Sequence, residues 1–496
     1  MARFVFDNSY ARDLPGFYAP CPPQTVRAPH LLFLNQALAD ELHLDLDADA
    51  AQAHAELFAG NALPAGAAPI AQAYAGHQFG GFSPQLGDGR ALLIGEVIDR
   101  HGRRRDIAFK GSGRTPFSRN GDGKAAVGPM LREVLIGEAM HALGIPTTRA
   151  LAVVATGEPV QRETVLPGAV LTRVAASHLR VGTFEYFAAR DDIERVRRLA
   201  DYAIARHDPD IAGSATPYLD FLRAAIRRQA TLVAQWMQVG FIHGVMNTDN
   251  MSIAGETIDY GPCAFLEQYV PERAFSSIDT HGRYAYRNQP GIAQWNLARL
   301  AETLLPLIDA DQKRAVALAT AAIEEFPPLY RERWLAGMRD KLGLNATMAD
   351  DADSALIDDW LALLETAQVD FTLAWRRLAA AAEGMAEPLR TLFADSAALD
   401  AWLVRWQTRC RAEDGGDGRT AARRGERMRS INPWLIPRNH RVEEALAAAS
   451  DHGDLGPFNA LLAALRTPYN ETPARQHLAD PAPGEFTASY RTFCGT

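Results

Sequence analysis

The chain has 496 residues, of which 47% are hydrophobic and 22% charged, an ordinary globular composition from which we expect two or three packed subregions. A formal net charge of −9 argues against a protein that wraps nucleic acid, although a local basic cleft is compatible with it. The four cysteines lie far apart, without Cys-x-x-Cys or zinc spacing, which argues against a structural metal or a disulfide framework and fits a reducing compartment.

The N-terminal residues contain no apolar signal core and include Asp7 and Asp13, so they are typical of neither a secretory signal nor a transit peptide. No stretch approaches the roughly 20 apolar residues that a membrane-spanning helix requires. We therefore expect a cytoplasmic protein with no membrane partner.

The first part of the chain predicts an irregular lead-in, with a helix near residues 31–42 and an alanine-rich helical patch after it. Residues 69–89 are then rich in glycine and aromatic side chains. At the end of this stretch, Gly87, Gly89 and Arg90 form the sequence QLGDGR, which would let backbone amides approach a phosphate group. A bare Gly-x-Gly is also typical of a tight turn, so the phosphate interpretation depends on the strand that follows.

Two strands are predicted over residues 90–99 and 105–110. In the second strand, the alternating pattern places Ile107 on one face and Ala108 and Lys110 on the other. A lysine presented from a rigid strand is typical of kinases, in which it contacts nucleotide phosphates. The alternative is a lysine at the end of a strand in solvent.

A long polar, glycine-rich segment follows over residues 111–128, and we expect it to cover a ligand, since it is too polar for a core and too long for a plain turn. A helix is then predicted over residues 129–143. Its Glu133 is placed to form the ion pair that orients Lys110 on phosphates, as in kinases. Taken alone, Glu133 would more often be a solvated helix residue.

Strands predicted over residues 149–156 and 164–174 complete a mainly β first lobe. Arg173 and Arg180 follow at the edge of the helical part. Either is compatible with a surface position, but two arginines near a hinge are also what a multiply charged phosphate chain requires.

The remainder of the chain is predicted to be helical, beginning with residues 191–207 and 216–240. The second of these helices leads directly into residues 241–261, with the sequence FIHGVMNTDNMSIAGETIDYG. A loop asparagine followed by an aspartate before an aromatic residue and a glycine is how kinase-like enzymes hold metal-bound nucleotide phosphates.

In this loop, Asn250 and Asp259 supply the hard oxygen atoms that a divalent metal needs. We expect a hairpin around Gly255 to turn both side chains toward one cavity. The position of the catalytic aspartate of kinases is occupied by Val245, but Asp249 lies beside Asn250 and can reach an incoming hydroxyl as a general base. The alternative for Asp249 is an aspartate that only caps the turn.

Several long stretches resemble the selenoprotein O family, which includes the YdiU-like proteins of bacteria. The resemblance covers nearly the whole chain and rests on AYAGHQFGGFSPQLGDGRA, KGSGRTPFSRNGDGKAAVGPMLREVLIGEAM, HLRVGTFEYFA, HGVMNTDNMSI, DYGPCAFLE and NPWLIPRNHRVEEAL. It implies an α+β, protein-kinase-like two-lobed fold with a mainly β N-lobe, a helical C-lobe and additional C-terminal helices. It also implies transfer of AMP from ATP to serine, threonine or tyrosine hydroxyls of proteins, with release of pyrophosphate.

By the same resemblance, Lys110 pairs with Glu133 and contacts phosphate, and Asp249 is the proton acceptor. Asn250 and Asp259 would hold Mg²⁺ or Mn²⁺, with Asp259 also at the nucleotide. The other positions that match the family's nucleotide-binding residues are Gly87, Gly89, Arg90, Asp122, Gly123, Arg173 and Arg180. The resemblance further implies that ATP lies reversed relative to kinases, with its α-phosphate toward the acceptor.

The chain is predicted to consist of four parts. Residues 1–70 would form an N-terminal extension that packs on the lobes, residues 71–178 a kinase-like N-lobe, and residues 179–310 a kinase-like C-lobe with the catalytic and metal loops. Residues 311–496 would form a helical C-terminal region. Its tail contains Cys494, at the place where some members of the family carry selenocysteine.

Two other functions are compatible with the sequence. A true phosphotransferase would use the same metal residues with ATP in the usual orientation, but Val245 argues against it. A catalytically silent pseudokinase would bind nucleotide and act as a scaffold. Use of UTP in place of ATP is also possible, and the sequence indicates neither the protein substrates nor the preferred metal.

Overall fold

The N-lobe is built on an eight-stranded antiparallel sheet with the strand order β1-β3-β6-β7-β10-β9-β2, in which β8 also pairs with β10. The computed structural model describes residues 4–47, 50–344, 351–414 and 419–493. The strands of the sheet are β1 (Tyr18–Pro20), β2 (His30–Leu34), β3 (Ile70–Gln72), β6 (Ala91–Ile98), β7 (Arg104–Lys110), β8 (Ala125–Ala126), β9 (Arg149–Gln161) and β10 (Val165–Ala175).

Strand β7 divides its side chains between the two faces of the sheet, as its alternating pattern predicts. Phe109 belongs to a hydrophobic cluster that α2 (Gln36–Glu41) and α3 (Ala51–Ala59) cover. Lys110 points to the opposite face, on which α4 (Val127–Ala142) packs against β9 and β10. The sheet therefore presents Lys110 to the side on which the helical lobe lies.

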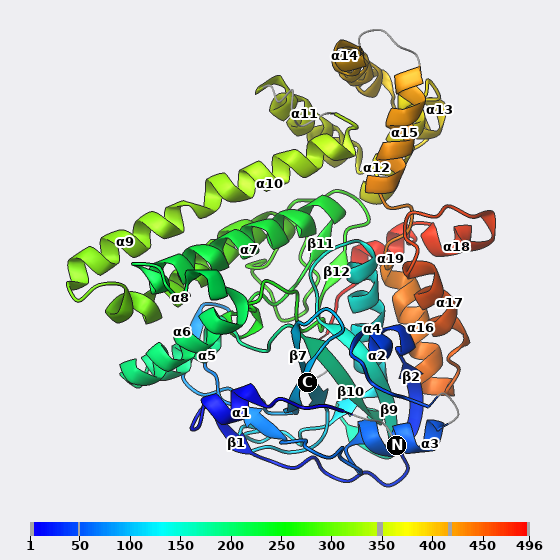
Figure 1. Ribbon diagram of the computed structural model, residues 1–496. Coiled ribbons are helices and arrows are strands. Elements are labelled where there is room, and N and C mark those ends of the chain that lie inside the picture. Colours follow the sequence, from blue (N-terminus) through cyan, green and yellow to red (C-terminus); the bar gives the residue numbers. More distant parts are fainter. Residues whose placement is uncertain (1–3, 48–49, 345–350, 415–418, 494–496) are drawn as a thin grey trace.

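A helical lobe follows the sheet, so the fold is an α+β, kinase-like two-lobed fold (Figure 1). The polar loop over residues 241–261 lies between two of its helices and includes the strand β11 (Phe241–Ile242), which pairs with β12 (Ala264–Phe265). The helices of this lobe are α5 (Val181–Ala188), α6 (Ile193–His207), α7 (Pro217–Val239) and α8 (Gln289–Ile308). A separate hairpin of β4 (Gly76–Gln78) and β5 (Gly81–Ser83) lies against the polar loop.

Helices of the C-terminal region extend beyond both lobes. Figure 1 shows α16 and α17 beside α4, and their many contacts with α4 attach them to the N-lobe. The remaining helices are α1 (Ser9–Asp13), α9 (Gln312–Glu324), α10 (Phe326–Lys341), α11 (Asp351–Ala367), α12 (Phe371–Ala382), α13 (Glu387–Arg390), α14 (Ala397–Asp414), α15 (Arg419–Ile431), α16 (Asn439–His452), α17 (Gly456–Leu465), α18 (Gln476–Ala479) and α19 (Gly484–Ser489).

Residues 432–438, which contain two prolines and precede α16, anchor the C-terminal helices to the helical lobe. Arg438 is completely buried, and its guanidinium donates hydrogen bonds to Glu267 at 2.7 Å and to Asp370 at 2.7 and 3.0 Å. The amide nitrogen of Asn439 donates to the backbone carbonyl of Phe265 in β12 at 2.9 Å. The C-terminal helices are therefore attached to the β11–β12 strand pair, which borders the polar loop.

The predicted helix over residues 31–42 is wrong in its first half. His30–Leu34 forms β2, which pairs with β9 at the edge of the sheet, and only Gln36–Glu41 is helical. The apolar run fits a half-buried edge strand, and this tertiary pairing decides its conformation. Asn35 ends the strand and caps α2, because its side chain accepts a hydrogen bond from the amide of Leu38.

The hairpin predicted around Gly255 does not form either. Ser252 pairs with Arg180, and Thr257 pairs with Thr147, each through an isolated bridge. The two sides of the turn are thus fixed to other parts of the chain rather than to each other. The strand predicted over residues 149–156 is longer than expected, since β9 continues to Gln161.

Two cysteines bear on the expected tail. Cys263, which follows the polar loop, is fully buried, and burial raises the pKa of its thiol to about 11, so it is not a reactive thiolate. Cys494 lies outside the described residues.

Within the described ranges, no helix combines the length and the apolar character needed to cross a membrane.

Candidate active site

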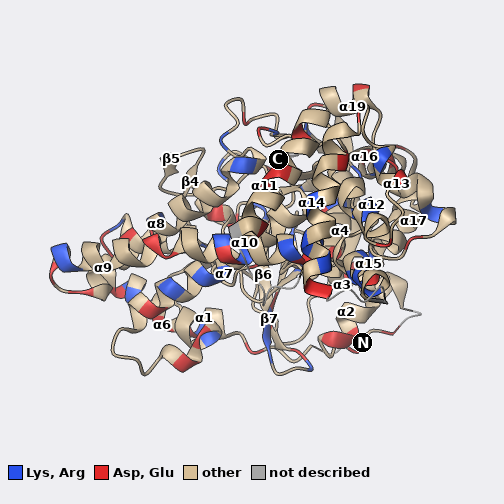
Figure 2. Cartoon of the chain, turned by 90° about the horizontal axis from the view of Figure 1, so that it is seen from above, with Lys and Arg blue, Asp and Glu red and all other residues tan. Residues whose placement is uncertain are grey.

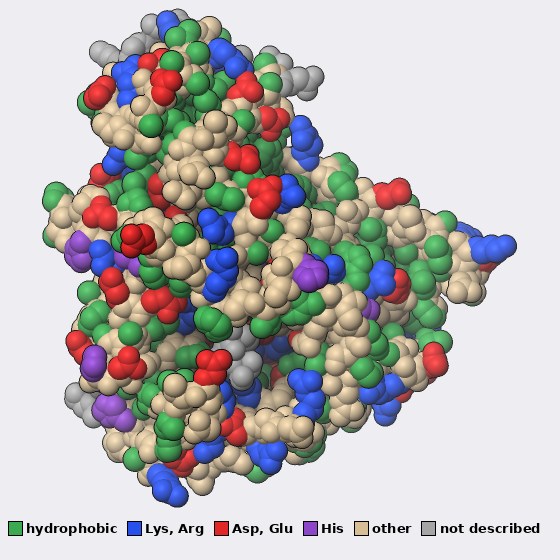
Figure 3. All heavy atoms as spheres, turned by 180° about the vertical axis from the view of Figure 1, so that it is seen from behind, with side chains coloured by type: hydrophobic (Ala, Val, Ile, Leu, Met, Phe, Trp, Pro, Cys, Tyr) green, Lys and Arg blue, Asp and Glu red, His purple; other side chains and the backbone are tan. Residues whose placement is uncertain are grey.

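A cavity of about 460 Å³ lies between the sheet and the polar loop. Seven Lys or Arg side chains and four Asp side chains line it, so a basic cleft exists within an acidic chain. The face shown in Figure 3 is hollowed between the N-lobe and the helices above it, with charged side chains at the walls. All the predicted site residues line this cavity except Glu133, which contacts it through Lys110.

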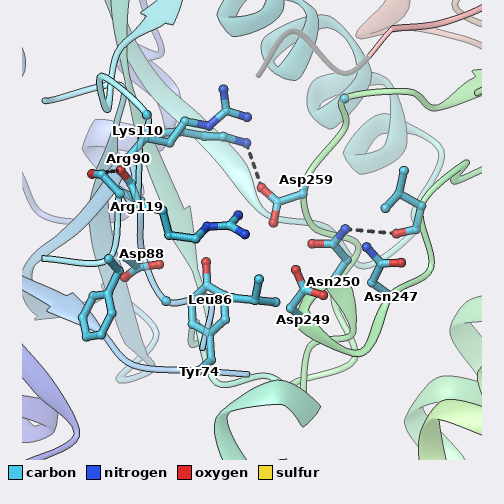
Figure 4. Close-up of a pocket in the computed structure, with 18 of the residues that line it drawn as sticks. Tyr74, Leu86, Asp88, Arg90, Lys110, Arg119, Asn247, Asp249, Asn250 and Asp259 are labelled. Atoms are coloured by element: carbon cyan, nitrogen blue, oxygen red, sulfur yellow. Dashed lines mark hydrogen bonds and ion pairs between the residues drawn. The ribbon is translucent and has the colours of Figure 1, made fainter. Parts of the chain in front are cut away.

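The two walls of the cavity carry different groups (Figure 4). Basic side chains extend from the N-lobe, and the carboxylates and amides of the polar loop face them. The labelled basic residues are Arg90, Lys110 and Arg119, and the labelled loop residues are Asn247, Asp249, Asn250 and Asp259.

Lys110 connects the two walls. Its ammonium group forms an ion pair with Glu133 of α4 and another with Asp259 of the polar loop, at 2.7 Å. Strand β7 fixes the backbone of Lys110, and Glu133 is buried, so this ion pair is held rigidly. The lysine and glutamate that the sequence pairs by analogy with kinases are therefore in contact.

Asp259 is surrounded by cations. Arg173 contacts one carboxylate oxygen at 2.7 Å, and Arg180 contacts the other at 3.2 Å. Burial alone would raise the pKa of Asp259, but Lys110, Arg173 and Arg180 outweigh it and hold the pKa well below the usual range. The residue has a left-handed backbone, with φ at 65°, a conformation that Asp tolerates better than most side chains. Three cations thus converge at one point, as a chain of phosphates requires.

Arg180 also supports the loop that carries Asp249. Its guanidinium donates to the backbone carbonyl of Asp249 at 2.7 Å and lies 4.5 Å from the ring centre of Tyr74. The side chain is almost completely buried. This buried cation therefore contacts both Asp249 and Asp259.

The turn at QLGDGR approaches the cavity through its backbone. Gly87 has φ at 74°, and a β-carbon there would lie 2.4 Å from the ring of Phe117, so only glycine fits. Between the glycines, Asp88 is buried and accepts a hydrogen bond from the amide of Gln72, which fastens the turn to β3. The backbone of Gly89 is held by internal bonds, since its amide donates to the carbonyl of Gly87 at 2.8 Å and its carbonyl accepts from the hydroxyl of Ser118.

The glycine-rich connection closes another side of the cavity. Asp122 forms an ion pair with Arg162 of the N-lobe at 2.9 Å and accepts a hydrogen bond from the amide of Lys124. Gly123 has φ at 70° and lies against the backbone of Gly113, where a β-carbon would clash. Asp122 and Gly123 thus shape the connection, and Arg162 adds a cation that the sequence did not indicate.

The polar loop is anchored at His243, which is buried against Trp236. Its Nε2 donates to the carbonyl of Ile258 at 2.9 Å, next to Asp259. Burial lowers the pKa of this histidine. Val245 lies in the cavity wall, and its backbone carbonyl accepts a hydrogen bond from the amide nitrogen of Asn250 at 3.0 Å.

Asp249 is the loop carboxylate whose oxygens contact no Lys or Arg side chain in the part of the chain that the structure describes. Burial raises its pKa to about 6, although Arg180 opposes the shift. One oxygen accepts a hydrogen bond from Gln78 at 3.2 Å, and the other, Oδ1, is buried without a hydrogen-bond partner among the described residues. A β-carbon at Gly76 would lie 2.7 Å from Oδ1, so the β4–β5 hairpin packs closely on this carboxylate.

The hairpin is attached to the loop by a second set of hydrogen bonds. Glu185 of α5 accepts from the hydroxyl of Thr248 and from Nδ1 of His77, each at 2.5 Å. The amide of His77 donates to the same hydroxyl at 2.7 Å. Burial raises the pKa of Glu185, while the two donors lower it. The position of Asp249 is thus fixed by residues on both of its sides.

Comparisons with known proteins identify the family of the chain. A family model described as "Protein adenylyltransferase SelO" matches residues 2–466. A relative from Cereibacter sphaeroides, named "Protein nucleotidyltransferase YdiU", is 62% identical over 496 residues, covering 99% of this chain and 100% of the relative. The chain belongs to the SelO family. Relatives of the same name from Chromobacterium violaceum and Agrobacterium fabrum are 60% identical (97% of this chain, 100% of the relative) and 56% identical (99% of each).

Membership in the SelO family makes the chain a nucleotidyltransferase that uses ATP and protein substrates. The kinase-like two-lobed fold of this chain accounts for the Lys110–Glu133 pair in an enzyme whose kinase base position is Val245.

The loop oxygens of this SelO member fit a divalent cation. The amide nitrogen of Asn250 is engaged with Val245, which leaves its amide oxygen as a ligand, and Asp259 supplies a carboxylate to the same cavity. Among the described residues, no three His, Cys, Asp or Glu side chains form a metal site of their own. A cation held here would therefore depend on Asn250, Asp259 and the phosphate oxygens of a nucleotide, which is usual for Mg²⁺.

Sequence reasoning missed several residues that the SelO fold brings to the cavity. Gln78, Asp88 and Asn247 lie within or next to the quoted motifs, but nothing in their spacing indicates a contact with the site. The side-chain oxygen Oδ1 of Asn247 accepts hydrogen bonds from the hydroxyl of Tyr284 and the backbone amide of Phe79. Contacts of this kind join distant segments, so only the folded structure reveals them.

Proposed function

We propose that the chain transfers AMP from ATP to serine, threonine or tyrosine hydroxyls of proteins and releases pyrophosphate, with Asp249 as the proton acceptor. The observation that carries the proposal is Asp249, which lines the cation-rich cavity and whose buried Oδ1 has no hydrogen-bond partner among the described residues. A carboxylate oxygen in this state is placed to accept a proton from an incoming hydroxyl.

The proposed reaction is an in-line displacement at the α-phosphorus. The acceptor hydroxyl gives its proton to Asp249 as its oxygen forms a bond to that phosphorus. The bond between the α-phosphorus and the bridging oxygen breaks, and pyrophosphate leaves with the bonding electrons. Lys110, Arg173 and Arg180 would neutralise the charge that develops on the phosphates.

These cations now contact Asp259, so phosphates must replace some of these contacts when ATP binds. We propose that Asn250 and Asp259 then hold Mg²⁺ or Mn²⁺. The bound cation supplies positive charge to phosphate oxygens. Glu133 keeps Lys110 in place during this exchange, since their ion pair does not involve Asp259.

The nucleotide would be held by the cavity walls in the orientation that the resemblance implies. The α-phosphate would face Asp249, and the glycine turn at Gly87 and Gly89 would approach with its backbone. Arg90, Asp122 and Gly123 would contact the remainder of the nucleotide. The location of each of these residues in one cavity supports the proposal.

Labelled ATP tests the transfer. With Mg²⁺ or Mn²⁺ present, we expect protein to acquire label from the α-phosphate and none from the γ-phosphate. The variant Asp249→Asn, which keeps the size of the side chain, should lower the rate at least about 100-fold. Label from the γ-phosphate alone would indicate a true kinase. No label from ATP labelled at either phosphate would indicate a scaffold. A parallel reaction with α-labelled UTP determines the preferred nucleotide.

A further inference from the structure

A second cavity, of about 740 Å³, opens beside the nucleotide cavity and shares Phe79 and Ile278 with it. We infer that this second cavity is the docking site for the acceptor polypeptide, and that it binds a segment with an apolar side chain next to acidic side chains. The inference deepens the proposed function, on which it rests, by giving the chemical character of the substrate.

One wall of the docking site is the β4–β5 hairpin. Figure 2 shows this hairpin beside α8, and its sequence GHQFGGFS contains no Lys, Arg, Asp or Glu. Its two aromatic side chains, Phe79 and Phe82, are 37% and 42% exposed. Of the two, Phe79 lines the second cavity, and exposed aromatic side chains are enriched where proteins bind other polypeptides.

Phe79 is kept in this place at an energetic cost. Its φ is 52°, a left-handed backbone conformation that is rare for residues with bulky side chains. The strain is maintained because its amide donates hydrogen bonds to the hydroxyl of Tyr284 at 3.0 Å and to the side chain of Asn247 at 3.2 Å. Backbone strain that the surrounding structure maintains is concentrated at functional sites. Phe79, whose backbone carries this strain, lines both cavities and so lies where they meet.

The opposite wall presents Ile278, which is 55% exposed. The next residue, Asp279, turns inward, and its carboxylate accepts hydrogen bonds from the amides of Arg283 and Tyr284 at 2.9 and 2.8 Å. The loop that carries Ile278 is therefore held by internal bonds. Phe79 and Ile278 form a fixed apolar rim on which an apolar side chain can pack.

Cations lie next to this rim. The guanidinium of Arg283 stacks 4.9 Å from the ring centre of Trp295, and within the described residues it forms no salt bridge. Arg287 is exposed and pairs with the exposed Glu272, a contact of little stability. Asp279 also lines the cavity, but its carboxylate is buried and bonded to two backbone amides. The more exposed charges of the lining, on Arg283 and Arg287, are positive, which favours an acidic partner.

The hairpin also relates docking to chemistry. Gln78, which precedes Phe79, donates the hydrogen bond to Asp249. A segment packed on Phe79 is therefore next to the carboxylate that would accept the proton. A hydroxyl within a few residues of the docked apolar side chain can reach the α-phosphate in the nucleotide cavity.

Three synthetic peptides test the inference, measured for binding by fluorescence anisotropy and for AMP transfer by mass spectrometry. The first contains one Ser, one nearby Leu and several Glu; the second has Lys in place of each Glu; the third has Gly in place of Leu. We expect the first to bind at least about tenfold more tightly than the other two. Equal binding of all three, or no binding of the first, would overturn the inference.

Variants locate the binding. Ile278→Asp should weaken binding of the acidic peptide at least about tenfold, and Val404→Asp, at a similarly exposed apolar position on α14, should not. Arg287→Glu, alone or with Arg283→Glu, should reduce the preference for Glu over Lys, while the affinity for ATP changes less than about twofold. Arg314→Glu is the matched control, because Arg314, like Arg287, is an exposed arginine paired with a carboxylate.

The outcomes separate the docking site from the reaction. Binding that depends on Ile278 and Arg287 without AMP transfer would support the site and contradict the proposed acceptor chemistry. AMP transfer that is equal for all peptides and unaffected by both variants would support the reaction and contradict the site. Loss of self-association in Ile278→Asp, with peptide binding unchanged, would assign the surface to a second copy of the chain and contradict the inference.

Discussion

Asp249 and Asp259 show how neighbouring residues give two similar carboxylates different properties. Asp259 contacts three cations, which hold its pKa well below the usual range against the effect of burial. Asp249 is also buried, but Gln78 and the backbone are its polar contacts, and burial raises its pKa to about 6. The first carboxylate is suited to charge neutralisation and the second to accepting a proton.

The close packing of Gly76 on Asp249 leads to a prediction about position alone. Gly76→Ala adds a β-carbon 2.7 Å from Oδ1 of Asp249, so the carboxylate must move. We expect the rate of AMP transfer to fall by about 10- to 100-fold, since small displacements of catalytic groups have effects of this size. ATP affinity, measured by calorimetry, should change little.

Gly81→Ala in the same hairpin is the matched control for that experiment. A β-carbon at Gly81 would lie 3.5 Å from the nearest atom, an ordinary contact. This variant should keep the transfer rate within about twofold. Equal rates for the two variants would show that the hairpin does not position Asp249.

Lys341 provides a prediction for stability against pH. It is buried, with its ammonium 4.7 Å from the ring centre of Trp375, and burial lowers its pKa from 10.5 to about 7. Between these two values the unfolded chain binds more protons, so this residue makes the free energy of unfolding rise with pH from about 7 to about 10. Below pH 7 the folded protein carries the full cost of the buried charge.

Lys341→Met should remove this contribution. We expect the free energy of unfolding at pH 6 to rise by about 1–3 kcal/mol, and the gain to shrink as the pH approaches 10. Urea denaturation across this pH range measures it, with the exposed Lys313→Met as control. A gain that is the same at pH 6 and pH 10 would contradict the assignment.

At the scale of elements, pattern and local chemistry predict most of the strands and helices around the site. The alternation in β7 gives the direction of Lys110, and the 3.6-residue period of α4 gives the helix of Glu133. The errors occur where distant pairing decides the structure. Residues 30–34 become a strand because β9 offers an edge, and the turn at Gly255 is fixed by Arg180 and Thr147 rather than by its own strands.

The segment before α16 makes a testable attachment between elements. Arg438→Met leaves Glu267 and Asp370 buried without their cation, so we expect the free energy of unfolding to fall by about 3–5 kcal/mol. Arg441→Met, which removes a partly exposed pair with Glu444, should lower it by about 0.5 kcal/mol or less. Thermal unfolding of both variants measures the difference, and similar losses would show that Arg438 is not an anchor.

At the scale of the whole molecule, the sequence predicts the two-lobed fold and many of the residues that line the main cavity. It does so because each motif is a short segment with its own local chemistry, as in QLGDGR or the polar loop. What it does not predict are contacts between motifs. Arg162 reaches Asp122 only because β9 and β10 project beside the glycine-rich connection, and Gln78 reaches Asp249 only because the hairpin folds onto the loop.

The phosphate that lies nearest to Asp249 distinguishes transfer of AMP from transfer of the γ-phosphate. This distinction is tested most directly by a structure of the protein with a non-hydrolysable ATP analogue and Mg²⁺ or Mn²⁺. We predict the α-phosphorus nearest to the Asp249 carboxylate, with the β- and γ-phosphates among Lys110, Arg173 and Arg180. A γ-phosphate nearest to Asp249, with the α-phosphate directed away from the polar loop, would contradict the account.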